Sequence, residues 1–134
     1  MALDDEIKVP SDAGEWADGL REILRRIPPK RGRYIDVGPG WYAIIVQLDQ
    51  ELAQIDPDYV VHQVKEKFGG LRYYYATERA DLRPAMDRLV RGAEAAADRT
   101  CEITGHAGVL MIRYGQYKTI DPAIAPEGSV RADQ

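Results

Sequence analysis

The chain has 134 residues and a mass of 15.0 kDa, which is the usual size of one domain. Its content of 45% hydrophobic and 30% charged residues is typical of a soluble globular protein, and no apolar stretch is long enough to predict a membrane span. The only cysteine, Cys101, excludes an internal disulfide and a metal site built from cysteines alone. Residues 1–6 are acidic where a secretory signal is basic and then apolar, so we expect the protein in the cytoplasm.

The net charge of −4 hides an alternation of charged blocks along the first half of the chain. Residues 1–20 carry six acids and one lysine, residues 21–33 carry six basic residues and one acid, and residues 34–64 carry five acids and no lysine or arginine. Nucleic-acid-binding proteins usually have an excess of positive charge over a whole face. The short basic block therefore predicts a solvated helix face with acidic neighbours, and specific phosphate contacts are the alternative.

Hydrophobic spacing predicts two helices in the first half of the chain. Asp12, with Glu15 three residues later, indicates a capped start, so the first helix is expected over 12–27 and ends before two prolines. The second helix is expected from Trp41 to the turn at 56–58. The Gly-Pro-Gly turn at 38–40 lacks the later residues that a phosphate-binding loop requires.

A β-hairpin is predicted next, because 59–65 is rich in β-branched residues and 71–75 can pair with it. Gly69 and Gly70 are expected to supply positive φ angles at the turn. Since strand side chains alternate, Tyr73 lies on one face of the hairpin, while Arg72 and Tyr74 share the other. At least one of the tyrosines in this strand is therefore expected to be exposed.

The last third of the chain predicts one more helix and a small hairpin. Asp81 is expected to cap a helix over 81–99, with Pro84 in its first turn. The remaining residues up to 125 predict a hairpin, and 126–134 is expected to be a flexible tail. The fold class is therefore α+β, with three helices packed on a small antiparallel sheet in a single domain over 1–125.

Three parts of the sequence resemble a family of small uncharacterised proteins of bacteria and phages. They are Gly40-Trp41-Tyr42, the helix that contains Leu48 and Asp49, and above all the run VKEKFGGLRYY at 64–74. The resemblance covers about residues 38–125. It implies a phage or prophage origin for the chain.

In that family the third helix is followed by a zinc ribbon with a Cys-x-x-Cys-Gly knuckle and a Cys-x-x-His knuckle, which together supply four ligands. Cys101 is kept here as a relic ligand, but Thr104, Asp121 and Ile124 occupy the other three ligand positions. The resemblance therefore implies a degenerate zinc-ribbon-like hairpin over 101–125, with no metal and no other cofactor. The side chains expected to pack in place of the metal are Leu110, Ile112, Tyr114 and Ile124. A three-ligand site made of Cys101, His106 and Asp121 is the alternative.

Catalytic patterns are weak in this sequence. The least unlikely enzyme is a metal-dependent nuclease, with Asp58 before a strand that carries Gln63-Val64-Lys65 in place of an acid-x-lysine element. A thiol site would need Cys101 beside His62 or His106, and no local motif indicates one. His62 is better interpreted as a half-buried strand residue. We therefore expect that the protein is not an enzyme.

The hairpin turn is the first candidate binding surface. It carries Lys65, Lys67, Phe68, Arg72 and Tyr74, a basic and aromatic set that is typical both of protein-binding hot spots and of platforms that stack single-stranded nucleic acid. For this turn the structural interpretation is the better one: Phe68 folds back over the core, and Lys65, Lys67 and Arg72 protect exposed strand edges. The second candidate surface is the polar side of the first helix, with Arg21, Arg25 and Arg26.

These observations predict a small accessory protein that binds another protein and modulates its activity or assembly. A nucleic-acid-binding module derived from a zinc ribbon is the first alternative, and it would lose affinity steeply with salt. A structural protein of a virion is the second alternative. No membrane partner is expected.

Overall fold

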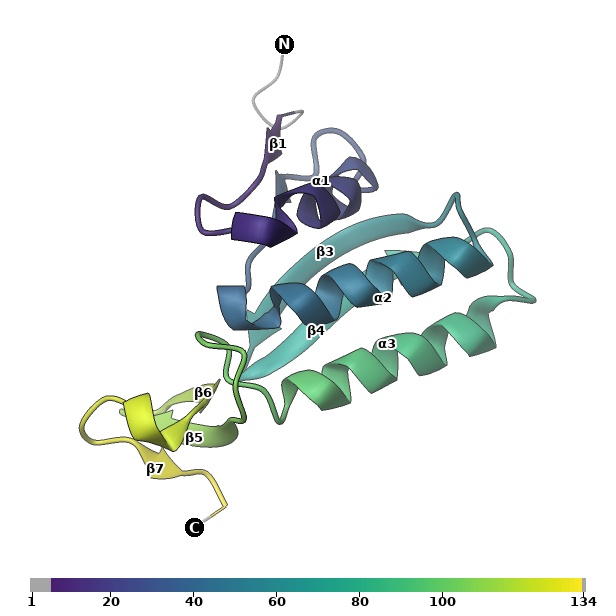
Figure 1. Cartoon of the computed structure of the whole chain (residues 1–134). Helices are drawn as coiled ribbons and strands as arrows, with labels where there is room; N and C mark the ends of the chain where they lie inside the picture. Colours follow the sequence, from purple (N-terminus) through teal and green to yellow (C-terminus); the bar gives the residue numbers. More distant parts are fainter. Residues whose placement is uncertain (1–5, 134) are drawn as a thin grey trace.

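Two helices cover one face of a long β-hairpin in the computed structural model, which describes residues 6–133 (Figure 1). The hairpin consists of β3 (Val60–Lys67) and β4 (Gly70–Ala76), and the helices are α2 (Tyr42–Ile55) and α3 (Arg83–Ala97). This arrangement is a mixed α+β fold, as the sequence predicts. No helix within 6–133 is long and apolar enough to cross a membrane.

The N-terminal part packs on the same core. Helix α1 (Ala17–Arg25) follows a 3₁₀ turn, η2 (Gly14–Trp16), and is shorter than the predicted 12–27. The start is later because Gly14 has a φ of +54° and the Asp12 carboxylate does not cap the helix but accepts a hydrogen bond from the Tyr42 hydroxyl at 2.7 Å. The short strands β1 (Ile7–Lys8) and β2 (Arg33–Tyr34) pair in parallel beside α1.

Helix α2 and the hairpin follow the prediction closely, because their apolar positions match the helical and strand periods. Helix α2 begins after the 3₁₀ turn η3 (Pro39–Trp41) and buries Ile45, Leu48 and Leu52. A bulge at His62 shifts the register of β3, and His62 itself is half-buried. The strand face toward the helices carries Val64 and Tyr73, which pair across the hairpin.

The turn of this hairpin differs from the prediction. Lys67 pairs with Gly70, so the two loop residues are Phe68 and Gly69, with φ angles of 54° and 83°. Two-residue hairpin loops with two positive φ angles are type I′ turns, whose twist matches the strands that flank them. Gly70 is thus a strand residue, and a phenylalanine takes the place expected for a glycine.

Helix α3 also begins later than predicted, at Arg83 instead of Asp81. The Asp81 carboxylate does not cap this helix, because it pairs with the Arg79 guanidinium at 3.2 Å. Pro84 lies in the first turn, as predicted, and the helix ends at Ala97.

The C-terminal part forms a second, smaller sheet at the end of the molecule (Figure 1). Strands β5 (Val109–Arg113) and β6 (Gln116–Ile120) form the expected hairpin, and β7 (Val130–Arg131) pairs with β5 inside the predicted flexible tail. A 3₁₀ turn, η4 (Pro122–Ile124), precedes β7. The core of this unit consists of Cys101, Met111 and Ile120 with Val109 and Ala125 against them. The predicted packing was wrong for Leu110, Tyr114 and Ile124, which are exposed.

Hydrogen bonds attach this unit to the main core. The Gly40 amide donates to the Glu102 carbonyl at 2.7 Å, and the Gly38 amide donates to the Glu102 carboxylate at 2.9 Å. The Trp41 indole donates to the Thr100 carbonyl at 2.8 Å, and the Thr119 hydroxyl donates to the Gly69 carbonyl at 2.7 Å. The last of these bonds fixes the tip of the β3–β4 hairpin against β6.

Candidate functional site

Phe68 protrudes from the tip of the β3–β4 hairpin, with 69% of its surface exposed. The structural interpretation in which it folds back over the core is therefore wrong. Its φ of 54° lies in the left-handed region, which bulky residues rarely adopt and which favours asparagine or glycine. The Lys67 ammonium lies 5.6 Å from the centre of the Phe68 ring. The tip thus presents an aromatic ring and a cation together to solvent.

The backbone of this tip is held from both sides. The Gly69 amide donates to the Glu66 carboxylate at 2.7 Å, and its carbonyl accepts the bond from Thr119. A Cβ at Gly69 would lie 2.5 Å from a methyl group of Leu110, so the turn is pressed against the C-terminal sheet. Because the backbone is fixed in this way, Phe68 is presented from a rigid support.

The outer face of the hairpin brings the other predicted residues together. Lys65 lies opposite Arg72, and Tyr74 lies opposite Gln63, on the face turned away from Val64. Tyr74 is 43% exposed, and Lys67 is exposed near the tip. Neither Lys65 nor Lys67 forms an ion pair within residues 6–133. The first candidate surface is therefore continuous, basic and partly aromatic.

The second candidate surface does not join it. Arg21 pairs with Asp18 at 3.1 Å and Arg25 with Glu22 at 2.5 Å, each within one turn of α1. This is the solvated helix face that the charge pattern predicts, and such exposed pairs contribute little stability. Arg26 differs from both, because it points into the protein and only 19% of its side chain is exposed.

Arg26 belongs to a buried polar network that links α1, α2 and both strands of the hairpin. Its Nε donates to the Asp49 carboxylate at 2.7 Å, and its Nη1 donates to the Pro57 carbonyl at 3.1 Å. The Tyr59 hydroxyl donates to the same Asp49 oxygen and lies 2.8 Å from the Tyr73 hydroxyl. The guanidinium also stacks over the Tyr59 ring at 4.8 Å. Arg26 is thus a structural residue.

Alkaline pH is expected to unfold the protein through this network. Burial, reinforced by the negative charge of Asp49, raises the pKa of Tyr59 and of Tyr73 far above the ordinary value of about 10. The stability that the two neutral hydroxyls supply is fully present below about pH 10 and is lost at higher pH, because only the unfolded chain ionises them readily. Absorbance at 295 nm and circular dichroism, recorded together above pH 10, should show part of the tyrosinate signal appearing with unfolding. Complete ionisation in a still folded chain would contradict this.

Cys101 is buried beneath the turn that follows α3. Burial raises the pKa of its thiol, but the Thr104 hydroxyl and the backbone amides of residues 103, 104 and 121 donate toward the sulfur and bring the pKa below its usual value. The Asp121 carboxylate is engaged elsewhere, since it accepts the Ala123 amide at 2.9 Å. His106 is exposed, and residues 6–133 contain no cluster of three potential metal-ligating side chains. The alternative three-ligand site is therefore not assembled.

The candidate nuclease residues are not brought together. Asp58 lies in the turn before β3 and Lys65 near the far end of this strand, so about 20 Å of extended chain separates them. Asp56, the buried carboxylate beside Asp58, is occupied by the Thr77 hydroxyl at 2.6 Å and by the Asp58 amide at 3.0 Å. One phosphate could not contact Asp58 and Lys65 at once.

The exposed face of the C-terminal sheet was not predicted from the sequence. Tyr117, Ile112 and Val130 pair side by side across β6, β5 and β7, so they lie on the face opposite the buried Met111. Tyr117 and Val130 are exposed, and Tyr114 at the β5–β6 turn is 84% exposed. The sequence of β5 is apolar at every position from Val109 to Ile112, so no alternation in it could have indicated this face.

Comparison of the chain with models of protein families, with curated proteins and with solved structures gives no match. The class of protein is therefore described from its fold and its exposed side chains alone. It is a small α+β protein in which two hairpins carry exposed aromatic side chains at one end of the molecule.

Proposed function

We propose that this protein is a non-enzymatic accessory protein of the cytoplasm, encoded by a phage or prophage, that binds another protein and modulates its activity or assembly. The observation that carries the proposal is Phe68, an aromatic side chain held at a positive φ and directed into solvent. Lys65, Lys67, Arg72 and Tyr74 lie on the same hairpin.

The backbone conformation of Phe68 has a cost in free energy. A bulky residue in the left-handed region costs about 1 to 2 kcal/mol, and burial inside the protein does not offset this cost here. Exposed aromatic and arginine side chains are the residues that contribute most to protein–protein binding once a partner covers them. A contact with another molecule therefore explains why the tip keeps a phenylalanine where asparagine fits better.

Replacing Phe68 by Asn is expected to raise the free energy of unfolding by about 0.5 kcal/mol, because asparagine tolerates the positive φ and only an exposed cation–ring contact is lost. The same variant is expected to bind the partner at least tenfold more weakly. Urea denaturation measures the first effect. A loss of stability above 1 kcal/mol would instead show that Phe68 supports the fold.

The experiment that tests the function is a tagged capture from lysate of the source organism, with and without nuclease, at moderate salt. We expect the wild type and Arg88→Ala to retain one stoichiometric protein after nuclease treatment. We expect neither Phe68→Asn nor the double variant Arg72→Ala/Tyr74→Ala to retain it. Arg88 is a suitable control because it is exposed on α3, away from the hairpin. Retention of the protein by Phe68→Asn would remove the hairpin tip from the proposal. Assembly of the pure chain into a large particle would favour a virion protein.

Nucleic-acid binding remains the second candidate, because one specific observation favours it. A cation lies over the exposed ring at both hairpin tips, with Lys67 over Phe68 and Arg113 over Tyr114. Such pairs can stack on bases and contact phosphates. Material that disappears from the capture after nuclease treatment, with an affinity that falls steeply as salt rises, would identify this function.

A further inference from the structure

The two hairpin tips at this end of the molecule are built in the same way. Lys67-Phe68-Gly69 closes β3–β4, and Arg113-Tyr114-Gly115 closes β5–β6. The φ angles of the loop residues are 54° and 83° in the first tip and 51° and 78° in the second. In the second tip the Arg113 guanidinium lies 4.8 Å from the centre of the Tyr114 ring. Tyr114 thus accepts the same backbone strain as Phe68 without any burial in return.

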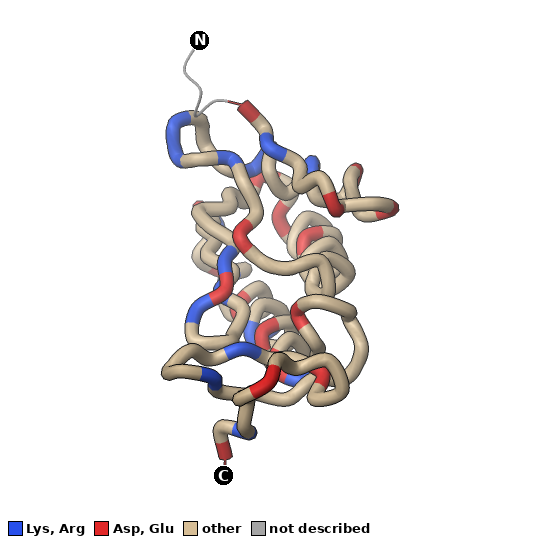
Figure 2. Tube along the Cα trace, turned by 90° about the vertical axis from the view of Figure 1, so that its left-hand side faces the viewer, with Lys and Arg blue, Asp and Glu red and all other residues tan. Residues whose placement is uncertain are grey.

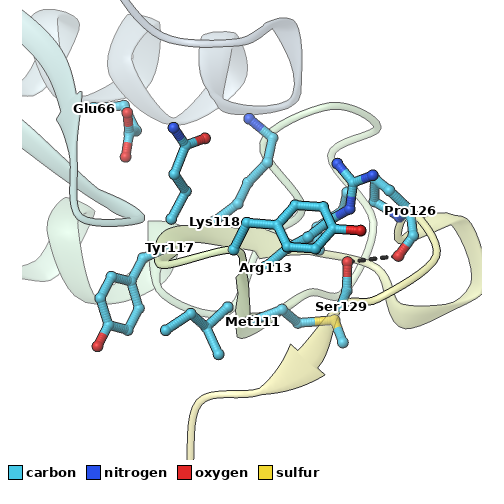
Figure 3. A pocket seen from close by; sticks show the side chains of 11 residues that line it. Glu66, Met111, Arg113, Tyr117, Lys118, Pro126 and Ser129 are labelled. Atoms are coloured by element: carbon cyan, nitrogen blue, oxygen red, sulfur yellow. Dashed lines mark hydrogen bonds between the residues drawn. The ribbon is translucent and has the colours of Figure 1, made fainter.

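A hollow of about 370 Å³ lies between the second tip and the end of the first hairpin (Figure 3). Tyr114 is one of its lining residues, and Glu66, two residues before Phe68, lies on the side opposite Pro126. Met111, Lys118 and Ile120, which share one face of the C-terminal sheet, line it together with Ile112 and Tyr117 of the opposite face. The hollow therefore connects the two tips through a surface of mixed character, on which aliphatic and aromatic side chains lie beside Gln116 and Lys118.

The acidic and basic side chains around this surface differ in whether they have partners inside the protein. Three acidic side chains here are engaged internally: Glu66 accepts the Gly69 amide, Glu102 accepts the Gly38 amide and pairs with Lys118, and Asp121 accepts the Ala123 amide. Glu127 and Asp133 are exposed. By contrast, Lys65, Lys67 and Arg131 have no acidic partner within residues 6–133, and Arg113 donates only to the Glu127 carbonyl. Figure 2 shows lysine and arginine positions following one side of the trace down to the C-terminal sheet. Lys67 and Arg113, the cations at the two tips, are thus available to an acidic group of an external partner.

We infer that the hollow and the two tips bind an acidic segment of a partner protein. Phe68 and Tyr114 are the two aromatic anchors, and Lys67 and Arg113 contact carboxylates beside them. This inference rests on the proposed function and extends it, because it adds the second tip and the chemistry of the partner. An acidic protein segment fits better than a nucleic acid, since Met111 and Ile112 line the hollow with aliphatic side chains that offer no stacking surface to a base.

The test uses the full chain in two separate variants, Phe68→p-benzoylphenylalanine and Tyr114→p-benzoylphenylalanine, which are irradiated in nuclease-treated lysate of the source organism. Mass spectrometry identifies the cross-linked peptide. Ile103→p-benzoylphenylalanine is the control, because Ile103 is exposed on the turn after α3, outside both tips. The charge contribution is tested with Lys67→Glu/Arg113→Glu, for which Arg88→Glu/Arg79→Glu is the matched control. Both control arginines are exposed, on α3 and before it.

We expect both tips, but not position 103, to cross-link to one acidic segment of one protein. We also expect Lys67→Glu/Arg113→Glu to weaken capture of that protein at least tenfold, whereas Arg88→Glu/Arg79→Glu changes it less than twofold. Capture of a partner that cross-links to neither tip, or that ignores the charge reversal, would overturn this inference and leave the proposed function standing. Adducts with nucleic acid or with a second copy of this chain would overturn both this inference and the proposed function. The absence of any adduct, together with the absence of any captured protein, would also overturn both.

Discussion

Replacing Asp49 by Ala is expected to lower the free energy of unfolding by about 3 to 5 kcal/mol, which is a large part of the stability of a typical domain. Asp49 is only 4% exposed, and it accepts hydrogen bonds from Arg26 and Tyr59. Its removal leaves a half-buried guanidinium without its counter-charge and a buried hydroxyl with one partner fewer. Urea denaturation followed by circular dichroism measures the effect.

Two further variants separate this cause from a general effect of lost charge. Asp18→Ala removes the partner of Arg21 on the surface of α1 and should change stability by less than about 0.5 kcal/mol. The double variant Arg26→Met/Asp49→Leu replaces both charges by apolar groups and should recover most of the loss. If Asp49→Ala lost no more than Asp18→Ala, the buried network would contribute little to the fold.

The regular elements could be predicted because their information is local. Ile45, Leu48 and Leu52 repeat at the helical period, and α2 lies where that spacing places it. The β-branched residues of β3 and the tyrosines of β4 alternate in the same way, so exposed Tyr74 and buried Tyr73 follow from the strand period. The beginnings of α1 and α3 were less predictable, because Asp12 and Asp81 bond to distant or flanking residues instead of capping.

The site could be predicted only in part, because several of its properties depend on contacts that are distant in the sequence. Arg26 sits in a basic block, and nothing local indicates that Asp49, 23 residues later, withdraws it from the surface. Phe68 points outward because the register places it in the loop, and a shift of one residue would have placed Gly69 and Gly70 there. The repeated cation-aromatic-glycine pattern at 113–115 was the one local signal of the second tip.

The junction between the main core and the C-terminal sheet leads to the second large effect, which is expected for Gly40→Ala. A Cβ at Gly40 would lie 2.1 Å from the Cys101 carbonyl oxygen and 2.6 Å from the Gly105 amide nitrogen. Both are backbone atoms that cannot rotate away, so the start of α2 must separate from the turn that carries Cys101. The expected loss is about 3 kcal/mol.

Gly92→Ala on α3 is the matched control for Gly40→Ala, since a Cβ there meets nothing within 4 Å. It should raise the free energy of unfolding by up to about 1 kcal/mol, because alanine favours the helix. Hydrogen exchange provides the sharper measurement for Gly40→Ala: amides of β5 and β6 should lose protection more than those of α2. This follows because the substitution breaks the contact that places the C-terminal sheet beside the β3–β4 tip. Equal loss of protection in both parts would show instead that the two cores unfold as one unit.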